Sequence, residues 1–213
     1  KCDWSSDVCS SDLVDLSGLT CLPGFIDSHT HLMMEMGPKS SLERTRLNGS
    51  DYAFRSTQYA RRTLMAGFTT VRNLGDHGGQ DSIALRNAIN AGVVVGPRIY
   101  TAGAAIGSTG GHGDPTNGLS HDLMGDPGVG EGIINSVDDA AKAIRLHYKQ
   151  GVDVIKIMPS GGVLDEGSSG ENPQLTLEEI RALVTTSRDY GFVVAAHAHG
   201  KEAIRRAVLG GVD

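Results

Sequence analysis

The chain has 213 residues, enough for one large domain, and a formal net charge of −6 at pH 7. Its Lys and Arg residues are scattered and aromatic residues make up only 5%, which argues against a nucleic-acid-binding face. No apolar run is long enough to cross a membrane. We therefore expect a globular protein whose partners include neither nucleic acid nor a membrane.

The first residues differ from the rest of the chain. Residues 2–13, CDWSSDVCSSDL, are polar, repeat Ser-Ser-Asp and match a translated short-read sequencing adapter in one reading frame. We expect residues 1–13 to be such an artefact, a disordered tail being the alternative, and the natural sequence to resume near Val14. Cys21 is then the only cysteine, so no disulfide framework is predicted. Because the native N-terminus is not visible, a signal peptide is neither predicted nor excluded.

From Val14 onward, short apolar runs alternate with amphipathic helical segments. The sequence predicts strands at residues 21–28, 68–74, 97–103, 152–158 and 192–200. It predicts helices at residues 50–67, 81–92, 136–151, 176–191 and 201–211. The expected N-terminal signals are an N-cap at Ser50 and capping boxes at Ser136/Asp139 and Thr176/Glu179.

Strands that are apolar on both faces and alternate with helices predict a parallel sheet covered by helices. A doubly wound sheet and a (β/α)8 barrel both fit this pattern. Polar residues gather at the C-terminal ends of the first, fourth and fifth strands, which is where barrel enzymes carry their chemistry. A doubly wound fold more often has a glycine-rich turn after its first strand. We therefore predict an α/β fold in which residues 14–213 form about the first five βα units of a TIM barrel.

The first strand ends in two histidines, within LPGFIDSHTHL at residues 22–32. Side chains two residues apart on a strand share a face, so His29 and His31 should point the same way. Two converging imidazoles can share one divalent cation, and Asp27 on the same face could orient one of them. For this motif taken alone, a chance pair at the end of a strand is the alternative.

Lys156 stands in the otherwise apolar fourth strand, in DVIKIM. Because a buried unpaired ammonium is costly, this group must pair, lose its proton or react. Three outcomes are open: a structural ion pair, a Schiff base with a carbonyl substrate, or carboxylation by CO2 to a carbamate able to bridge two metal ions. The fifth strand ends in HAHG, with His197 and His199 on one face. Metal-type ligands at three strand ends favour a site over chance.

Five motifs together resemble the amidohydrolase superfamily, and within it the imidazolonepropionase-like branch that contains metal-dependent Xaa-Pro dipeptidases and carboxypeptidases. They are LPGFIDSHTHL, AGFTTVRNLGD, TGGHGD, GVDVIKIMPSGG and VAAHAHG. The resemblance implies two divalent metal ions, with zinc as the favoured identity. It implies that His29 and His31 bind one ion, that a CO2-derived carbamate on Lys156 bridges both ions, and that His197 binds the second.

A long loop carries the prediction for substrate binding. Residues 103–132 contain ten glycines without strong periodicity, and long loops inside compact domains are often functional. His112 lies in TGGHGD, and the resemblance implies that it contacts substrate, a solvent-facing histidine being the alternative. His199 is also assigned to substrate binding, although either histidine of HAHG could be the metal ligand. His121 and His147 are assigned no functional role.

The resemblance also implies a reaction, in which metal-activated hydroxide attacks an amide carbonyl. The parent protein is expected to hydrolyse a non-aromatic C–N bond in a small amide or dipeptide, and a homo-oligomeric parent is left open. The family's general-base Asp, a sixth-strand His, the closing strands and an accessory β-domain are expected outside residues 14–213, with the Asp beyond Asp213. The alternatives are a Schiff-base lyase acting through Lys156 and an inactive fragment with no function of its own.

Overall fold

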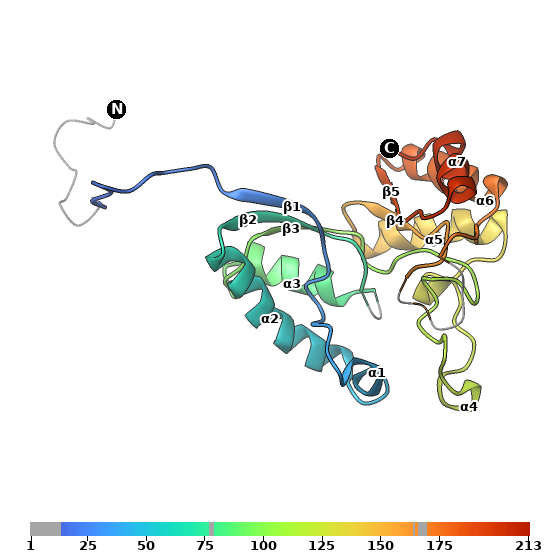
Figure 1. Cartoon of the computed structure of the whole chain (residues 1–213), viewed down its shortest axis with the longest axis horizontal. Coiled ribbons are helices and arrows are strands. Elements are labelled where there is room, and N and C mark those ends of the chain that lie inside the picture. The colour runs from blue at the N-terminus through green and yellow to red at the C-terminus, as the bar shows by residue number, and fades with distance from the viewer. Residues whose placement is uncertain (1–13, 77–78, 164, 166–169) are drawn as a thin grey trace.

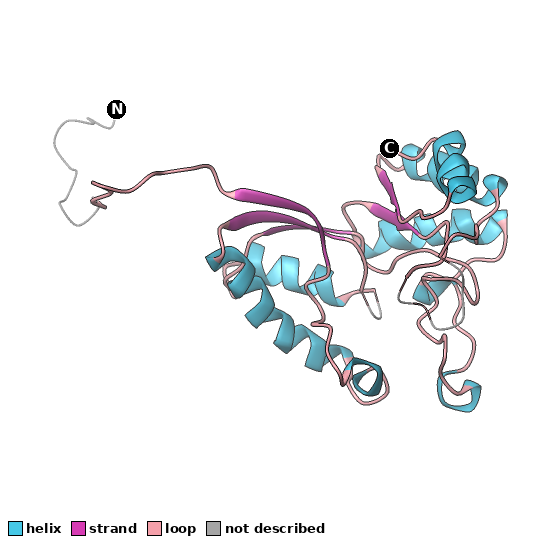
Figure 2. Cartoon of the chain, viewed as in Figure 1, coloured by secondary structure: helices cyan, strands magenta, loops and turns pink. Residues whose placement is uncertain are grey.

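The structure is a computed structural model that describes residues 14–76, 79–163, 165 and 170–213. The segment expected to derive from an adapter, residues 1–13, lies outside the described residues. Strands and helices alternate along the chain in an α/β fold with parallel strand pairing, as predicted (Figure 1, Figure 2). None of the helices in the described ranges has both the length and the apolar character needed to cross a bilayer.

The first three strands form one parallel sheet in the order β1-β2-β3. Its strands and the helices between them are β1 (Phe25–Thr30), α1 (Ser40–Glu43), α2 (Gly49–Met65), β2 (Phe68–Asn73), α3 (Asp81–Asn90) and β3 (Arg98–Thr101). Helices α2 and α3 pack on the same face of the sheet (Figure 1). Val71 and Ile99 are paired in register and buried on that face, so the apolar positions of neighbouring strands meet the helices.

The last two strands form a second parallel sheet, β4-β5. The elements of this half are α4 (His121–Met124), η2 (Val129–Glu131), α5 (Val137–Gln150), β4 (Ile155–Ile157), α6 (Leu177–Asp189), β5 (Val194–Ala196) and α7 (Lys201–Gly210). Helix α6 contacts both α5 and α7. The larger apolar core lies here, where Ile155 and Ile157 of β4 are fully buried against residues such as Ile180 and Leu183 of α6.

The two sheets are joined through the segment that follows β3, although the sequence predicts one continuous sheet. The chain leaves strand geometry at Gly103, whose φ is 63°, a conformation that side chains other than glycine rarely adopt. It then returns beside β4, where Ile106 N donates to Lys156 O at 2.8 Å and Met158 N donates to Ile106 O at 2.8 Å. The strands therefore follow one another in space in chain order, from β1 to β5.

Helix ends follow the predicted local chemistry with two exceptions. The box predicted at Ser136 and Asp139 forms only in part: Ser136 Oγ accepts from Asp139 N, but the Asp139 carboxylate accepts from Asn135 N at 3.1 Å. Thr176 Oγ1 accepts a hydrogen bond from Glu179 N, and the Glu179 carboxylate accepts from Thr176 N, so this capping box forms. Gly151 ends α5 with a left-handed φ of 80°. The prediction of Ser50 as the N-cap of α2 is wrong, because the helix begins one residue earlier and Asn48 is the cap.

Strand β1 is less buried than its apolar sequence predicts. Phe25 and Ile26 are 55% and 73% exposed, and β1 is hydrogen-bonded to β2 alone. At the other end, Asp213 N donates to Val194 O at 3.2 Å, so the chain lies beside β5 at its last residue. Among the described residues, β1 thus has one unpaired edge, and the last residue of the chain is hydrogen-bonded to β5.

Candidate metal centre and substrate loop

The two histidines of β1 lie close to each other. The ring centroids of His29 and His31 are 5.3 Å apart with an interplanar angle of 56°. Partial desolvation lowers the pKa of both rings, and the Lys156 ammonium lowers both further. Neutral imidazoles expose a nitrogen lone pair, which is the form that binds a metal ion.

Asp27 contacts the backbone of the histidine pair. The register between β1 and β2 shifts between Asp27 and Thr30, so the regular alternation of faces is broken there. Asp27 Oδ1 accepts a hydrogen bond from the backbone N–H of His29 at 3.0 Å. The carboxylate thus holds the backbone at the histidine pair, and its charge also acts on the His29 ring.

Lys156 lies in the middle of β4 and is only 2% exposed. No hydrogen bond or ion pair of its ammonium is found within the described ranges, and Nζ is not one of the fully buried atoms that lack a partner there. Desolvation, and secondarily the Arg72 guanidinium, lower the pKa of Lys156 to about 8. About one tenth of the amine is therefore neutral and nucleophilic at pH 7, against far less for an ordinary lysine, which suits either carbamate or imine formation.

His197 and His199 follow β5 directly and pack edge to face, with ring centroids 4.7 Å apart. Desolvation, followed by the charges of His112 and Lys156, lowers the pKa of His197 to about 4. His197 Nε2 is buried and has no hydrogen-bond partner among the described residues. His199 is exposed, and its backbone N–H donates to the buried Ser160 Oγ at 2.8 Å.

His112 is held at the same site by residues that follow β4. Its Nδ1 lies 2.6 Å from Asp165 Oδ1, and its backbone N–H donates to Gln174 Oε1 at 2.8 Å. The second carboxylate oxygen of Asp165 accepts from Gly162 N at 2.7 Å, which fixes the carboxylate against the turn. A Cβ atom at Gly162 would lie 2.3 Å from His112 Cε1, so glycine is the residue that leaves room for the ring.

The structure therefore brings the six predicted site residues towards one place, although β1 and β5 belong to different sheets. Lys156 acts electrostatically on His29, His31 and His197, and His112 lies against His197. Asp165 and Gln174 were not singled out from the sequence. The only signal for them was their position after the fourth strand, at the C-terminal strand ends where barrel enzymes carry their chemistry.

The donors fit a divalent cation in chemistry. The unpartnered Nε2 of His197, the neutral histidine pair and the unpaired amine of Lys156 are all available as ligands or as precursors of one. In the described part of the chain, no three His, Cys, Asp or Glu side chains are already gathered around one point. A site built here consequently depends on Lys156 as well as on the histidines.

The sequence matches the amidohydrolase family over residues 20–213. The chain belongs to this family. Ochratoxinase from Aspergillus niger is 34% identical to it over 159 residues, which are 70% of this chain and 32% of that protein. The match to the family confirms the resemblance that the five motifs indicated.

Two solved structures share this fold. A Xaa-Pro dipeptidase with methionine bound in its active site is 44% identical, with a TM-score of 0.84 over 90% of this chain and 47% of that one. A prolidase complexed with N-methylphosphonate-L-proline is 34% identical, with a TM-score of 0.75 over 89% of this chain and 46% of that one. The chain thus spans about half the length of these two proteins.

His147 and His121, which were assigned no functional role, lie outside this cluster. His147 is buried in α5, where its ring nitrogens contact the carbonyl oxygens of Ala143 and Ala104 at 2.9 and 2.8 Å. It therefore ties the helix to the segment after β3. The side chain of His121 is 73% exposed at the start of α4, beside Asp126.

Proposed function

We propose that the full-length protein is a metal-dependent hydrolase that cleaves a non-aromatic C–N bond in a small amide or dipeptide. The carrying observation is a buried, unpaired lysine surrounded by three histidines of lowered pKa: Lys156 with His29, His31 and His197. Family membership and the dipeptidase, prolidase and ochratoxinase relatives support the same class of reaction.

The architecture that we propose for the whole protein is a (β/α)8 barrel to which this chain contributes about five βα units. The parallel strands neighbour one another in chain order, which supports a barrel. In a doubly wound sheet the spatial order of the strands would reverse at one point. In such a barrel the ends of β1, β4 and β5 lie on one rim. That placement accounts for the convergence of side chains from two sheets.

In this proposal, His29 and His31 hold one cation, Lys156 as its carbamate bridges two, and His197 holds the second. Zinc is the favoured identity. When bound, two such cations make an activated water available near neutral pH and polarise the scissile carbonyl. The neutral Lys156 amine adds to CO2 and loses a proton, so an uncompensated buried cation becomes an anion suited to metal binding. His112, held by Asp165, and His199 contact the substrate.

A Schiff-base lyase acting through Lys156 is the second candidate, because a buried lysine with a pKa of about 8 is also suited to imine formation. The histidines around it favour the hydrolase, since imine chemistry has no need of three converging neutral imidazoles. Borohydride in the presence of a carbonyl substrate would trap a lyase covalently at Lys156. A carbamate would leave no such adduct.

The test uses the full-length protein, purified with and without added Zn2+ and bicarbonate. Metal content by elemental analysis and hydrolysis of Xaa-Pro dipeptides, other dipeptides and N-acyl amino acids are measured on the same preparation. We expect about two divalent ions per chain and metal-dependent release of amino acid. His121→Gln, which changes an exposed histidine outside the cluster, serves as the control and should match the wild type. Turnover that survives complete metal removal would refute the proposal.

A further inference from the structure

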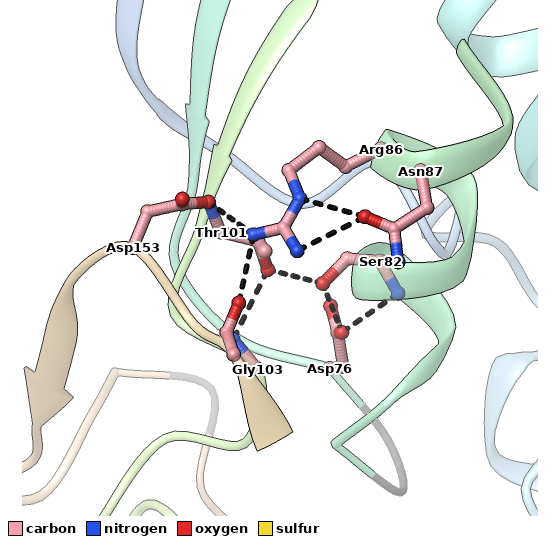
Figure 3. Close-up of polar contacts among 8 residues, drawn as sticks. Asp76, Ser82, Arg86, Asn87, Thr101, Gly103 and Asp153 are labelled. Atoms are coloured by element: carbon pink, nitrogen blue, oxygen red, sulfur yellow. Dashed lines mark hydrogen bonds and ion pairs between the residues drawn. The ribbon is translucent and has the colours of Figure 1, made fainter. Parts of the chain in front are cut away.

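A network of polar contacts joins the residue after the histidine pair of β1 to the start of β4. Its members come from β2, the loop after β2, α3, β3 and the turn before β4. They are Asn73, Asp76, Ser82, Thr101 and Asp153. Asn73, Ser82 and Thr101 are fully buried, in a region where unsatisfied polar groups are costly. Figure 3 shows the part of this network from Asp76 to Asp153.

Asp76 is the residue at which the contacts meet. Its Oδ1 accepts from Asn73 Nδ2 at 2.7 Å, and its Oδ2 accepts from Ser82 N at 3.0 Å and also from Ser82 Oγ. Three donors therefore converge on one carboxylate. Only an acceptor-only group satisfies all of them, because an amide at this position would present its own NH2 to one of the donors.

One branch leads from Asp76 to the histidine pair. Because Asn73 Nδ2 donates to Asp76, Asn73 Oδ1 is turned towards Leu32 and accepts from its backbone N–H at 2.7 Å. Leu32 directly follows His31 and is buried. A flipped Asn73 amide would set NH2 against this N–H and oxygen against the carboxylate, so Asp76 determines which way the amide faces.

The other branch leads to the strand of Lys156. Ser82 Oγ contacts Thr101 Oγ1, and Thr101 N donates to Asp153 Oδ2 at 2.9 Å. Asp153 N donates back to Thr101 O at 2.8 Å, and Arg86 Nη1 pairs with the Asp153 carboxylate at 2.6 Å. Asp153 lies two residues before β4, so this branch sets where β4 begins relative to β3.

We propose that Asp76 is a positioning residue, which aligns the end of β1 bearing His29 and His31 with the strand bearing Lys156. It acts through Asn73 on one side and through Ser82 and Thr101 on the other, and it touches none of the reacting groups. The inference rests on the proposed function only in so far as the aligned residues are metal ligands. The alignment itself is a property of the hydrogen bonds.

The test is Asp76→Asn in the full-length protein, with two readouts besides activity. Hydrogen exchange of the peptide containing Leu32 should become at least about tenfold faster, because the acceptor of its N–H is no longer oriented. Metal affinity, measured by competition with a chelator, should weaken by about tenfold, the scale typical of residues that orient ligands. We expect kcat to fall with KM nearly unchanged.

A swapped double variant separates positioning from general stability. In Asn73→Asp with Asp76→Asn, the carboxylate at position 73 accepts from Leu32 N and from the new amide, whose oxygen accepts from Ser82 N. The whole pattern is restored, so Leu32 exchange, metal affinity and kcat should return to within about threefold of the wild type. Thr176→Ala, which removes the cap of α6 far from β1, is the matched control. It should lower the melting temperature without changing Leu32 exchange.

Wild-type Leu32 exchange and metal affinity in Asp76→Asn would overturn the inference. So would faster exchange throughout the protein that the swap does not restore, since that pattern marks a general loss of stability. A wild-type protein that binds no divalent metal would refute the proposed function instead. In that case Leu32 exchange in the two variants still decides whether Asp76 aligns the strand.

Discussion

The imidazole of His112 lies against that of His197, with ring centroids 4.3 Å apart and ring planes inclined by 30°. One residue belongs to the glycine-rich loop after β3 and the other follows β5. The contact brings the expected substrate loop to an expected metal ligand. Because Asp165 holds His112 from the loop after β4, three successive loops meet at this point.

Asp165→Asn should weaken substrate handling while leaving the metal in place. The variant loses the charge-assisted hydrogen bond to His112 and turns an acceptor of Gly162 N into a donor. We expect kcat/KM of the full-length protein to fall by about tenfold, or about 1.4 kcal/mol, with unchanged metal content. Asp126→Asn, in the exposed His121–Asp126 pair, is the control and should have no effect. Equal activities of the two variants would contradict the role of Asp165.

Gly162→Ala should displace the His112 ring. The added Cβ would lie 2.3 Å from Cε1 and 2.4 Å from Nδ1 of His112, too close for the ring to stay. We expect a loss of kcat/KM at least as large as that of His112→Ala, measured in parallel. Gly130→Ala is the matched control, because its Cβ would meet nothing within 4 Å and the position has no positive φ. An active Gly162→Ala enzyme would show that the ring has no required place.

Replacing Lys156 should separate function from stability. Lys156→Ala should lose metal and activity together, and short carboxylic acids should restore part of both by standing in for the carbamate. Lys156→Met should instead stabilise the metal-free protein against urea by about 1–3 kcal/mol, because a buried unpaired amine is replaced by an apolar side chain of similar size. Retained metal with full turnover in Lys156→Ala would show that the lysine is structural only.

Asp76 should give the protein a distinctive pH dependence of stability. Desolvation raises its pKa from 3.8 to about 6, against the opposing hydrogen bonds from Ser82 and Asn73. The carboxyl group of Asp76 therefore binds a proton more tightly in the folded protein than in the unfolded chain. Its contribution to the free energy of unfolding is full below about pH 4 and is lost as the pH rises through 6. The expected loss is about 3 kcal/mol.

The measurement is the free energy of unfolding in urea at pH 4 and pH 7, for the wild type and for Asp76→Asn. The wild-type value minus the variant value should fall over this interval. Subtracting the variant removes the contributions of the other titrating groups. A difference that stays constant or grows with pH would contradict the raised pKa.

Residues 14–213 expressed alone should associate or form a molten state and should not hydrolyse amides. Phe25 and Ile26 are exposed on β1, whose outer edge is unpaired in the described chain. Edges of this kind pair with other chains. Size-exclusion chromatography, a thermal melt and a dipeptidase assay with added Zn2+ check the expectation. A monomer with a cooperative melt and metal-dependent turnover would show that these residues suffice.

The sequence by itself determined the features that depend on neighbours along the chain. The alternation of strands and helices, the Thr176–Glu179 capping box and the end of α5 at Gly151 were all predicted, because each is set within a few residues. The proximity of His29 and His31 was predicted for the same reason. Ser50 and Asp139 show the limit, since Asn48 is the cap of α2 and the Asp139 carboxylate accepts from Asn135 N in place of Ser136 N.

Only the tertiary structure decided which distant groups meet. Asn73 binds a backbone N–H 41 residues away, and Asp165 binds His112 across 53 residues. No periodic pattern in the sequence indicates either hydrogen bond, because each depends on the path of a loop that follows a strand. The burial of Lys156 without a partner is likewise a result of packing between β4 and its neighbours. Local chemistry selects the elements, and the long-range packing of those elements determines which polar groups become partners.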